Sequence, residues 1–298
     1  MAHLKEVVDR INLIAYTKQI TKSMKMVSAS KLHKVQRVLL PLKEYTTACA
    51  NILQAALQGI DKMDLSHPLT HKKRDIPESF LFIIVASDRG LCGAFNKNIL
   101  KAAYQQIQTL QQTQSPKIEV ITIGKKAYQF FKKYDLTVID RYVDLLERDN
   151  FYSSELTTYC IEAFQQGYYS NILLAYTAFK NAVKQEITIA PFLPFVVDGI
   201  EKKASCMQAY QNQYIYEPSQ NVLIEKLMRE LLKNQVMSML VESCASEHAT
   251  RVTTMGKATD NAEELLKDLR VSYNRTRQSL ITNSIAEITS GAEALAEA

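Results

Sequence analysis

The residues best suited to chemistry gather in one glycine-bearing turn, Ser87-Asp88-Arg89-Gly90-Leu91-Cys92-Gly93-Ala94-Phe95-Asn96. The turn follows an apolar run and precedes a helical one, which is where α/β proteins bind phosphate groups. It carries neither the GxGxxG pattern of dinucleotide sites nor the GxxxxGK[ST] pattern of P-loops. We interpret its glycines as shaping a tight turn from strand to helix. A nucleotide-using enzyme with its site at residues 87–96 remains an alternative.

Nucleophilic and metal chemistry find little support elsewhere in the chain. A nucleophilic Cys92 needs a neighbouring base, and the nearest histidine in sequence is His71. The five histidines and five cysteines show no ligand spacing, so we expect no catalytic residue, no cofactor and no metal. The cysteines are odd in number and scattered, which favours small buried thiols over a disulfide framework: Cys49, Cys92, Cys160, Cys206 and Cys244.

Positive charge is concentrated at the N-terminus. The chain has a net charge of +5, and residues 1–45 contain nine Lys or Arg against Glu6, Asp9 and Glu44. A basic helix of this kind faces a partner, a membrane surface, nucleic acid or simply solvent. Nucleic acid is disfavoured, because Tyr16 is the sole aromatic residue among the basic ones before Tyr45.

Helix-breaking residues separate two long ends from a different centre. Six of the seven prolines and six of the eight glycines lie between Gly59 and Pro218. Each end can therefore run as one helix, and eighty helical residues would reach about 120 Å. We expect domains at 1–58 and 213–298, both coiled-coil helices, with an α/β domain at 59–212 inserted between them.

Apolar residues on the two ends repeat in alternating steps of three and four. Such a repeat predicts the seam of a left-handed coiled coil, and pairing of the two ends makes the coil antiparallel. The N-terminal seam is interrupted: Leu4, Val7, Ile11 and Ile14, then Met24 and Val27, then Val35, Val38 and Leu42. The C-terminal seam is unbroken: Val252, Met255, Thr259, Ala262, Leu266, Leu269, Tyr273, Thr276 and Leu280.

The centre alternates strand-like and helix-like runs. We predict strands at 80–86, 119–123, 136–139, 172–176 and 187–189, with helices at 95–112, 125–133 and 153–167. Strands that alternate with helices indicate a largely parallel sheet covered on both faces. The fold class is therefore α/β with long helices, in which a Rossmann-like domain is inserted into an antiparallel coiled coil.

Three stretches, in order along the whole chain, resemble the gamma subunit of F-type ATP synthases of the bacterial type. They are Ile20-Thr21-Lys22-Ser23-Met24-Lys25-Met26-Val27-Ser28-Ala29-Ser30-Lys31-Leu32, the turn at 87–93, and Ala258-Thr259-Asp260-Asn261-Ala262 with Arg277-Gln278, Ile281-Thr282 and Ser290-Gly291-Ala292-Glu293-Ala294. The resemblance implies a non-catalytic central rotor shaft of a proton- or sodium-driven synthase. Its partners would be the alpha and beta subunits, the epsilon subunit and the c-subunit ring.

The same resemblance implies two sets of contact residues. Met24, Lys25, Arg251, Gln278 and Thr282 fall at positions that face the ring of alpha and beta subunits, with Met24 and Lys25 near an acidic loop of beta. Tyr214, Tyr216 and Glu217 resemble the foot near the c ring and epsilon. Two departures stand out: Ser284 replaces the usual Glu, and Gly256 interrupts the long helix at a cost of about 1 kcal/mol.

Location follows from the same reading. The longest apolar run, residues 80–86, is far shorter than the roughly 20 residues that span a bilayer, and no signal peptide is visible. We expect a peripheral protein on the cytoplasmic face of a bacterial plasma membrane that binds no nucleic acid. The remaining alternative is a stand-alone basic coiled-coil scaffold with an α/β domain.

Overall fold

A computed structural model describes residues 2–57, 68–70, 78–114, 116–134, 136–143, 153–195, 217 and 219–296. The chain forms two compact units, which are treated separately below. Unit 1 comprises residues 1–29 and 251–298, and unit 2 comprises residues 30–250.

Two long helices supply the first and last elements, α1 (Ala2–Leu57) and α6 (Gln220–Ala296). The predicted continuity of both ends is confirmed. Helix α1 runs through Pro41, whose missing N–H removes one bond to the preceding turn without ending the helix. The predicted domain limits at 58/59 and 212/213 lie within or next to chain outside the described residues, so they stay a prediction.

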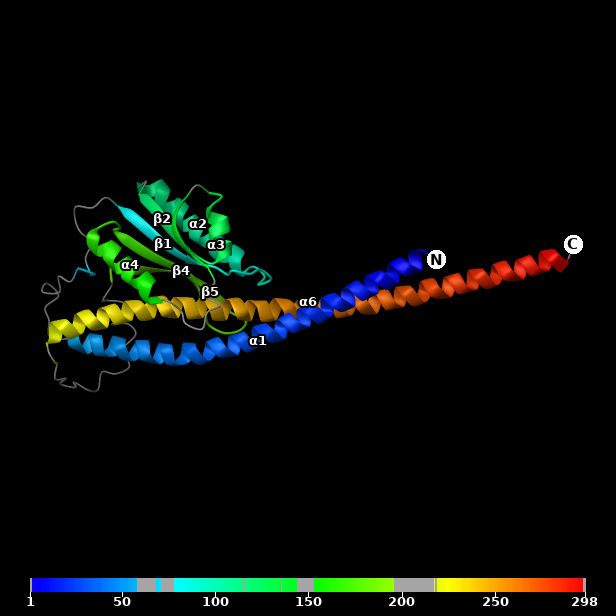
Figure 1. Ribbon diagram of the computed structural model, residues 1–298, viewed down its shortest axis with the longest axis horizontal. Helices are drawn as coiled ribbons and strands as arrows, with labels where there is room; N and C mark the ends of the chain where they lie inside the picture. The colour runs from blue at the N-terminus through cyan, green and yellow to red at the C-terminus, as the bar shows by residue number, and fades with distance from the viewer. Residues whose placement is uncertain are drawn as a thin grey trace. The chain divides into compact units, whose positions relative to one another are not determined.

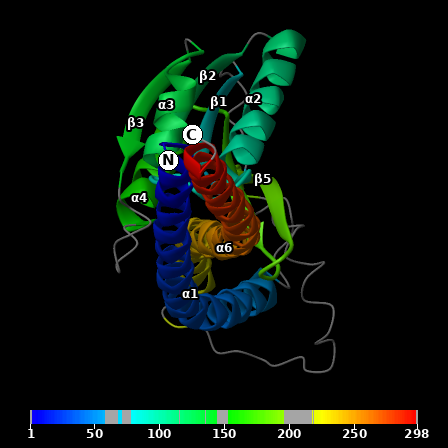
Figure 2. The same ribbon diagram turned by 90° about the vertical axis from the view of Figure 1, so that its right-hand side faces the viewer.

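Unit 1 is a pair of helices and nothing more. Residues 2–29 of α1 and 251–296 of α6 lie side by side, with the start of α1 and the end of α6 at the same end of the unit (Figures 1 and 2). The predicted antiparallel pairing of the two ends is confirmed. Helix α6 continues past the start of α1, and every residue from 281 to 292 is exposed.

Unit 2 is built on a five-stranded sheet in the order β3-β2-β1-β4-β5. The strands are β1 (Ser79–Val85), β2 (Lys117–Ile123), β3 (Thr137–Tyr142), β4 (Asn171–Phe179) and β5 (Gln185–Leu193). The first four are mutually parallel, and β5 pairs antiparallel with β4. The predicted, largely parallel sheet is therefore confirmed, with a β4–β5 hairpin at one edge.

Three further helices connect and cover the sheet: α2 (Phe95–Gln114), α3 (Lys125–Phe131) and α4 (Ser153–Gln166). Successive side chains of β1 point to opposite faces, because a strand has a period of two. Phe82 and Ile84 pack with α2 and α3, whereas Leu81 and Ile83 pack with α4 and with the α1 and α6 segments of unit 2. The sheet is thus a central layer with helices on both faces (Figure 1).

Candidate partner-binding surface

The seam of unit 1 follows the predicted spacing closely on α6. Between residues 260 and 280, every residue off the seam is exposed, and every seam residue is buried or half-buried. The buried members are Ala262 and Leu266, preceded by Met255. The remainder are half-buried, as expected of two helices with no third layer to cover them: Val252, Thr259, Leu269, Tyr273, Thr276 and Leu280.

The seam on α1 differs from the prediction in its middle section. Leu4, Val7, Ile11 and Ile14 are half-buried as expected, and the next seam positions are Lys18, Thr21 and Ser28. Val27 and Val38 are 58% and 41% exposed, so their assignment to the seam was wrong. Met24 is half-buried as predicted, so polar residues continue the seam on either side of it, which apolarity alone could not reveal.

Two polar contacts and one packing contact cross this middle section in one antiparallel register. Lys18 Nζ lies 3.1 Å from Glu263 Oε2, and the Thr259 hydroxyl donates to Thr21 Oγ1 at 2.9 Å. Lys25 lies against Gly256, one turn further along. The hydrogen bond and the charge of Lys18 hold the pKa of Glu263 below its usual range. Specific polar pairs of this kind fix the alignment of two helices more sharply than an apolar seam does.

Outside the seam, unit 1 presents apolar side chains to solvent. On α1 five are at least 58% exposed: Leu13, Tyr16, Ile20, Met26 and Val27. On α6 they include Ile281, Ile285 and Ile288, at a spacing of four and three, beyond the paired part of the helix. Large apolar residues lined up on an otherwise polar helix indicate a surface that a partner covers.

The predicted ring contacts occupy different settings. Met24 is half-buried, whereas Gln278 and Thr282 are exposed one turn apart, with the Thr282 hydroxyl donating to the Gln278 carbonyl at 3.0 Å. Arg251 is only 7% exposed, so most of its side chain is covered by other residues of this chain. Lys25 is exposed as a residue, although its outer methylenes rest on Gly256.

The predicted foot is described in part. Tyr214 and Tyr216 lie outside the described residues, and Glu217 is exposed. Nearby, at the start of α6, a groove of about 540 Å³ opens between α4 and α6. Its lining includes Tyr45 of α1, three basic side chains and one acidic side chain: Lys226, Arg229, Lys233 and Glu230. Arg229 is paired with Glu225, whose Oε1 lies 3.1 Å from the guanidinium. The lining is basic on balance, which suits an acidic partner.

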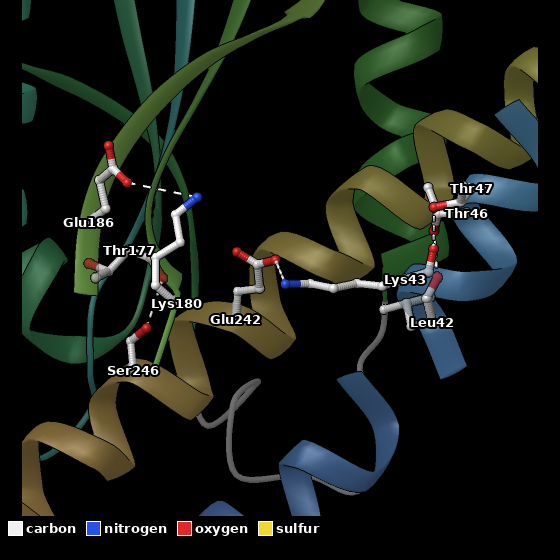
Figure 3. A network of polar contacts seen from close by, with 9 residues as sticks. All are labelled: Leu42, Lys43, Thr46, Thr47, Thr177, Lys180, Glu186, Glu242 and Ser246. Atoms are coloured by element: carbon white, nitrogen blue, oxygen red, sulfur yellow. Dashed lines mark hydrogen bonds and ion pairs between the residues drawn. The ribbon is translucent and has the colours of Figure 1, made fainter. Parts of the chain in front are cut away.

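Within unit 2, polar contacts tie α6 to α1 and to the sheet (Figure 3). Lys43 Nζ of α1 lies 2.9 Å from Glu242 Oε1 of α6, and the Ser246 hydroxyl donates to the Thr177 carbonyl of β4 at 3.1 Å. Residues 241–249 of α6 are all buried, which explains why this helix needs polar partners on more than one side. Burial, and then the charge of Glu242, raises the pKa of Tyr176 to about 12.

The turn at residues 87–96 is closed by its own side chains. Asn96 Oδ1 accepts from the Ser87 backbone N–H at 2.9 Å, and Asn96 Nδ2 donates to Ser87 Oγ at 2.7 Å. Asp88 Oδ1 accepts from the Lys125 N–H at the start of α3. Gly124 has a φ of 98°, and a Cβ at this position would clash with the carbonyl oxygen of Ala86. The close approach of the chain at Gly124 to the end of β1 therefore requires glycine. These contacts support the structural interpretation of the turn.

The described cysteines lie in the packed interior of unit 2. Cys49, Cys92, Cys160 and Cys244 are buried thiols that are not joined to one another by disulfides, and burial raises the pKa of Cys160 to about 12. Cys206 lies outside the described residues. Across the described ranges, no group of three or more His, Cys, Asp or Glu is placed to hold a metal ion. Nor does any helix in those ranges combine the length and apolarity needed to cross a membrane.

Comparison with known proteins is consistent along the whole chain. The family model described as ATP synthase matches residues 3–295. The ATP synthase gamma chain of Amoebophilus asiaticus is 43% identical over all of both chains, and that of Cytophaga hutchinsonii is 38% identical over 99% of each. The gamma chain of Chlorobium phaeobacteroides is 37% identical, again over 99% of each.

Solved structures share the fold at lower identity. A chain of the Euglena gracilis mitochondrial ATP synthase rotor matches with a TM-score of 0.61 at 20% identity, covering 94% of this chain and 99% of its own. A second Euglena structure, of the OSCP/F1/c-ring assembly, matches with a TM-score of 0.65 at 20% identity and covers 99% and 95%. Together with the full-length bacterial relatives, the matched model shows that the chain belongs to the ATP synthase gamma chain family.

Proposed function

We propose that this chain is the shaft through which an ion-driven c ring changes the conformations of the catalytic beta subunits. Its family makes it the central-stalk subunit of an F-type ATP synthase, and such subunits are not catalytic. The observation that carries the proposal is the form of unit 1. Two helices pack against each other along one seam, and their outward faces carry exposed apolar residues. Helix α6 also extends beyond the start of α1.

A shaft of this kind works by contact rather than by chemistry. A surface that differs from side to side meets each of three beta subunits with a different face, which biases each subunit toward a different conformation. The exposed isoleucines at 281, 285 and 288 are suited to an apolar bearing, whereas Met24, Lys25, Gln278 and Thr282 are suited to polar and charged contacts with the ring. Arg251, which is buried, would act chiefly by holding the shaft in shape.

The other end of the chain would contact epsilon and the c ring. Tyr214, Tyr216 and Glu217 are the foot residues of the proposal, and the basic groove between α4 and α6 supports an acidic partner nearby. The assembled complex would sit on the cytoplasmic face of a bacterial plasma membrane, with this chain attached through its partners.

Reconstitution tests the proposal directly. The purified chain, mixed with alpha and beta subunits, should elute with them as one stoichiometric complex that hydrolyses ATP. Failure to form that complex would favour a stand-alone coiled-coil scaffold instead.

Single substitutions then test the ring contacts. Gln278→Ala should lower ATP hydrolysis in the assembled complex without changing the helix content of the subunit, because Gln278 is exposed. Arg251→Ala should lower both activity and the unfolding midpoint, because its side chain is buried. Unchanged turnover in both variants would count against the assigned contacts.

A further inference from the structure

The helices on the two faces of the sheet in unit 2 differ in charge. Helices α2 and α3 cover one face, and α4 lies on the other (Figure 1). Neither α2 nor α3 contains an acidic residue, whereas α4 contains Glu155 and Glu162 and no basic residue. The lysines of α2, of α3 and of the turn after α3 are Lys97, Lys101, Lys125, Lys126, Lys132 and Lys133. These side chains, here called the α2–α3 face, together carry more positive charge than the net +5 of the whole chain.

The lysines lie on the outer side of the two helices. The inner side is apolar and packs on the sheet: Ile99, Ala103, Ile107, Ala127 and Phe131 are all buried. Lys126 is half-buried, with its Nζ donating to Gln129 Oε1 at 3.4 Å, and the other lysines are exposed. One carboxylate lies at the start of α3, where Asp88 accepts from the Lys125 backbone N–H at 2.9 Å. The outer side is therefore predominantly basic and open to a partner.

An aromatic group lies where α2 meets the end of α3. The ring centroids of Tyr104 and Tyr134 are 4.4 Å apart, and Phe130 lies 4.9 Å from Tyr134. Tyr134 is 44% exposed, whereas Tyr104 and Phe130 are half-buried. Tyrosine joins an apolar ring to a hydroxyl group, a combination that is enriched at the headgroup level of membranes. The α2–α3 face thus combines spread positive charge with an exposed tyrosine.

The spread of the lysines fits a flat anionic surface better than a compact ligand. Six residues of helix separate Lys126 from Lys132, which is roughly 9 Å along the axis. A single phosphate is held by donors that converge on it, whereas an anionic membrane attracts basic side chains over a wide area. An acidic protein is the alternative occupant, and it would bind without regard to lipid.

We propose that the α2–α3 face of unit 2 binds anionic phospholipid headgroups, with its lysines near the phosphates and Tyr134 among the headgroups. The inference goes beyond the proposed function, which attaches this chain to the membrane through its partners alone. It gives the chain a lipid contact of its own.

Sedimentation of the intact chain with vesicles tests the inference. Phosphatidylcholine vesicles that contain phosphatidylglycerol should bind the chain more tightly than pure phosphatidylcholine vesicles, and added salt should weaken the binding. Lys101→Gln/Lys133→Gln should lower the affinity for the anionic vesicles about 25-fold, because each lysine near such a surface contributes about fivefold. Lys226→Gln/Lys233→Gln removes the same charge from exposed positions of the groove on α6, so it is the matched control and should have a much smaller effect.

A site-specific label separates this face from the basic helix α1. In a Cys206→Ser background, Gln105→Cys places a nitroxide at an exposed position of α2, and Glu162→Cys places one at an exposed position of α4. On anionic vesicles the α2 label should become protected from a water-soluble relaxation agent, while the α4 label stays accessible. Equal protection of both labels or of neither would overturn the inference, as would equal losses of affinity in the two double variants.

Two further outcomes are distinct. Binding of the chain to polyglutamate but not to anionic vesicles would overturn the inference in favour of an acidic protein partner. Complex formation with alpha and beta subunits is measured on the same preparations. A wild-type chain that does not assemble refutes the proposed function, whereas normal assembly by a chain that ignores anionic vesicles refutes only the lipid contact.

Discussion

The two units of this chain bury their apolar residues to different depths. In unit 2, β1 and its neighbours are covered on both faces, and Phe82, Ile83 and Leu240 are fully buried. In unit 1, even the best-covered seam residue of α6, Met255, keeps some exposure, and most seam residues are half-buried. A layered unit stabilises itself, whereas a pair of helices gains much of its stability from what surrounds it. The contrast suits a self-supporting domain in unit 2 and a helix pair in unit 1 that partners enclose.

The largest expected effect compares one leucine in each unit, both on α6. Leu240→Ala should cost about 2–5 kcal/mol, because a fully buried leucine leaves a cavity in a packed core. Leu269→Ala should cost less than half as much, because this leucine is half-buried in the seam. Urea unfolding and hydrogen exchange of each variant measure the two costs. Equal losses would show that the seam is packed as tightly as the core.

Alkaline pH should weaken unit 2 through Tyr176. Burial raises the pKa of this tyrosine to about 12, above the usual value near 10, so the fold favours its protonated form. The resulting stability is complete below pH 10 and is lost as the pH rises through 12, by up to roughly 3 kcal/mol. The unfolding midpoints of the wild type and of Tyr176→Phe should change with pH in the same way up to pH 10. Above pH 10 the midpoint of the wild type should fall more steeply. Parallel curves from pH 8 to 12 would contradict this.

Gly256→Ala should strengthen unit 1. Alanine restores helix propensity worth about 1 kcal/mol, and its Cβ would meet Lys25 at an ordinary contact distance of 3.6 Å. Slower hydrogen exchange at residues flanking 256 would confirm it. Gly291→Ala, in open space, provides the matched control for propensity alone. A loss of protection in Gly256→Ala would mean that the lysine cannot share the site with a methyl group.

The smallest expected effect concerns the Lys18–Glu263 pair at the surface of unit 1. Lys18→Gln should return the pKa of Glu263 most of the way toward its usual range, because the hydrogen bond and charge of Lys18 are the largest causes of the lowering, ahead of the charges of Lys267 and Lys22. The depressed pKa favours the folded state above the usual pKa of a glutamate, and this contribution disappears as the pH falls through the lower value. An NMR titration of Glu263 at low and high salt would measure it. A shift that survives in Lys18→Gln would point to another cause.

Several elements were predictable because they depend on local pattern. The run at residues 80–86 is apolar throughout, as a doubly covered parallel strand must be, and it forms β1 within one residue of the predicted limits. The α6 seam from Val252 to Leu280 was predicted residue by residue. The failures at Val27 and Val38 have a shared cause: they are apolar but face outward, whereas the true seam positions in that stretch include Lys18 and Thr21.

The candidate contact residues depended on resemblance rather than on pattern. Nothing in the spacing of Arg251, Gln278 or Thr282 distinguishes the buried one from the two that are exposed. Exposure depends on which helix face meets a neighbour, and a periodic pattern reveals that face only where its residues are apolar.

Residue types alone determined the two unbroken helices, the seam that joins them and the covered sheet between them. Helix-breaking residues and apolar periodicity have their effect within a few residues of chain, so they can be recognised in the sequence. The tertiary structure alone decided that β5 runs antiparallel, that polar residues contribute to the α1 seam, and that Lys25 packs on Gly256. The seam contacts join residues that lie more than 200 positions apart in the sequence. A contact between such distant residues depends on how whole helices align, and no local pattern records it.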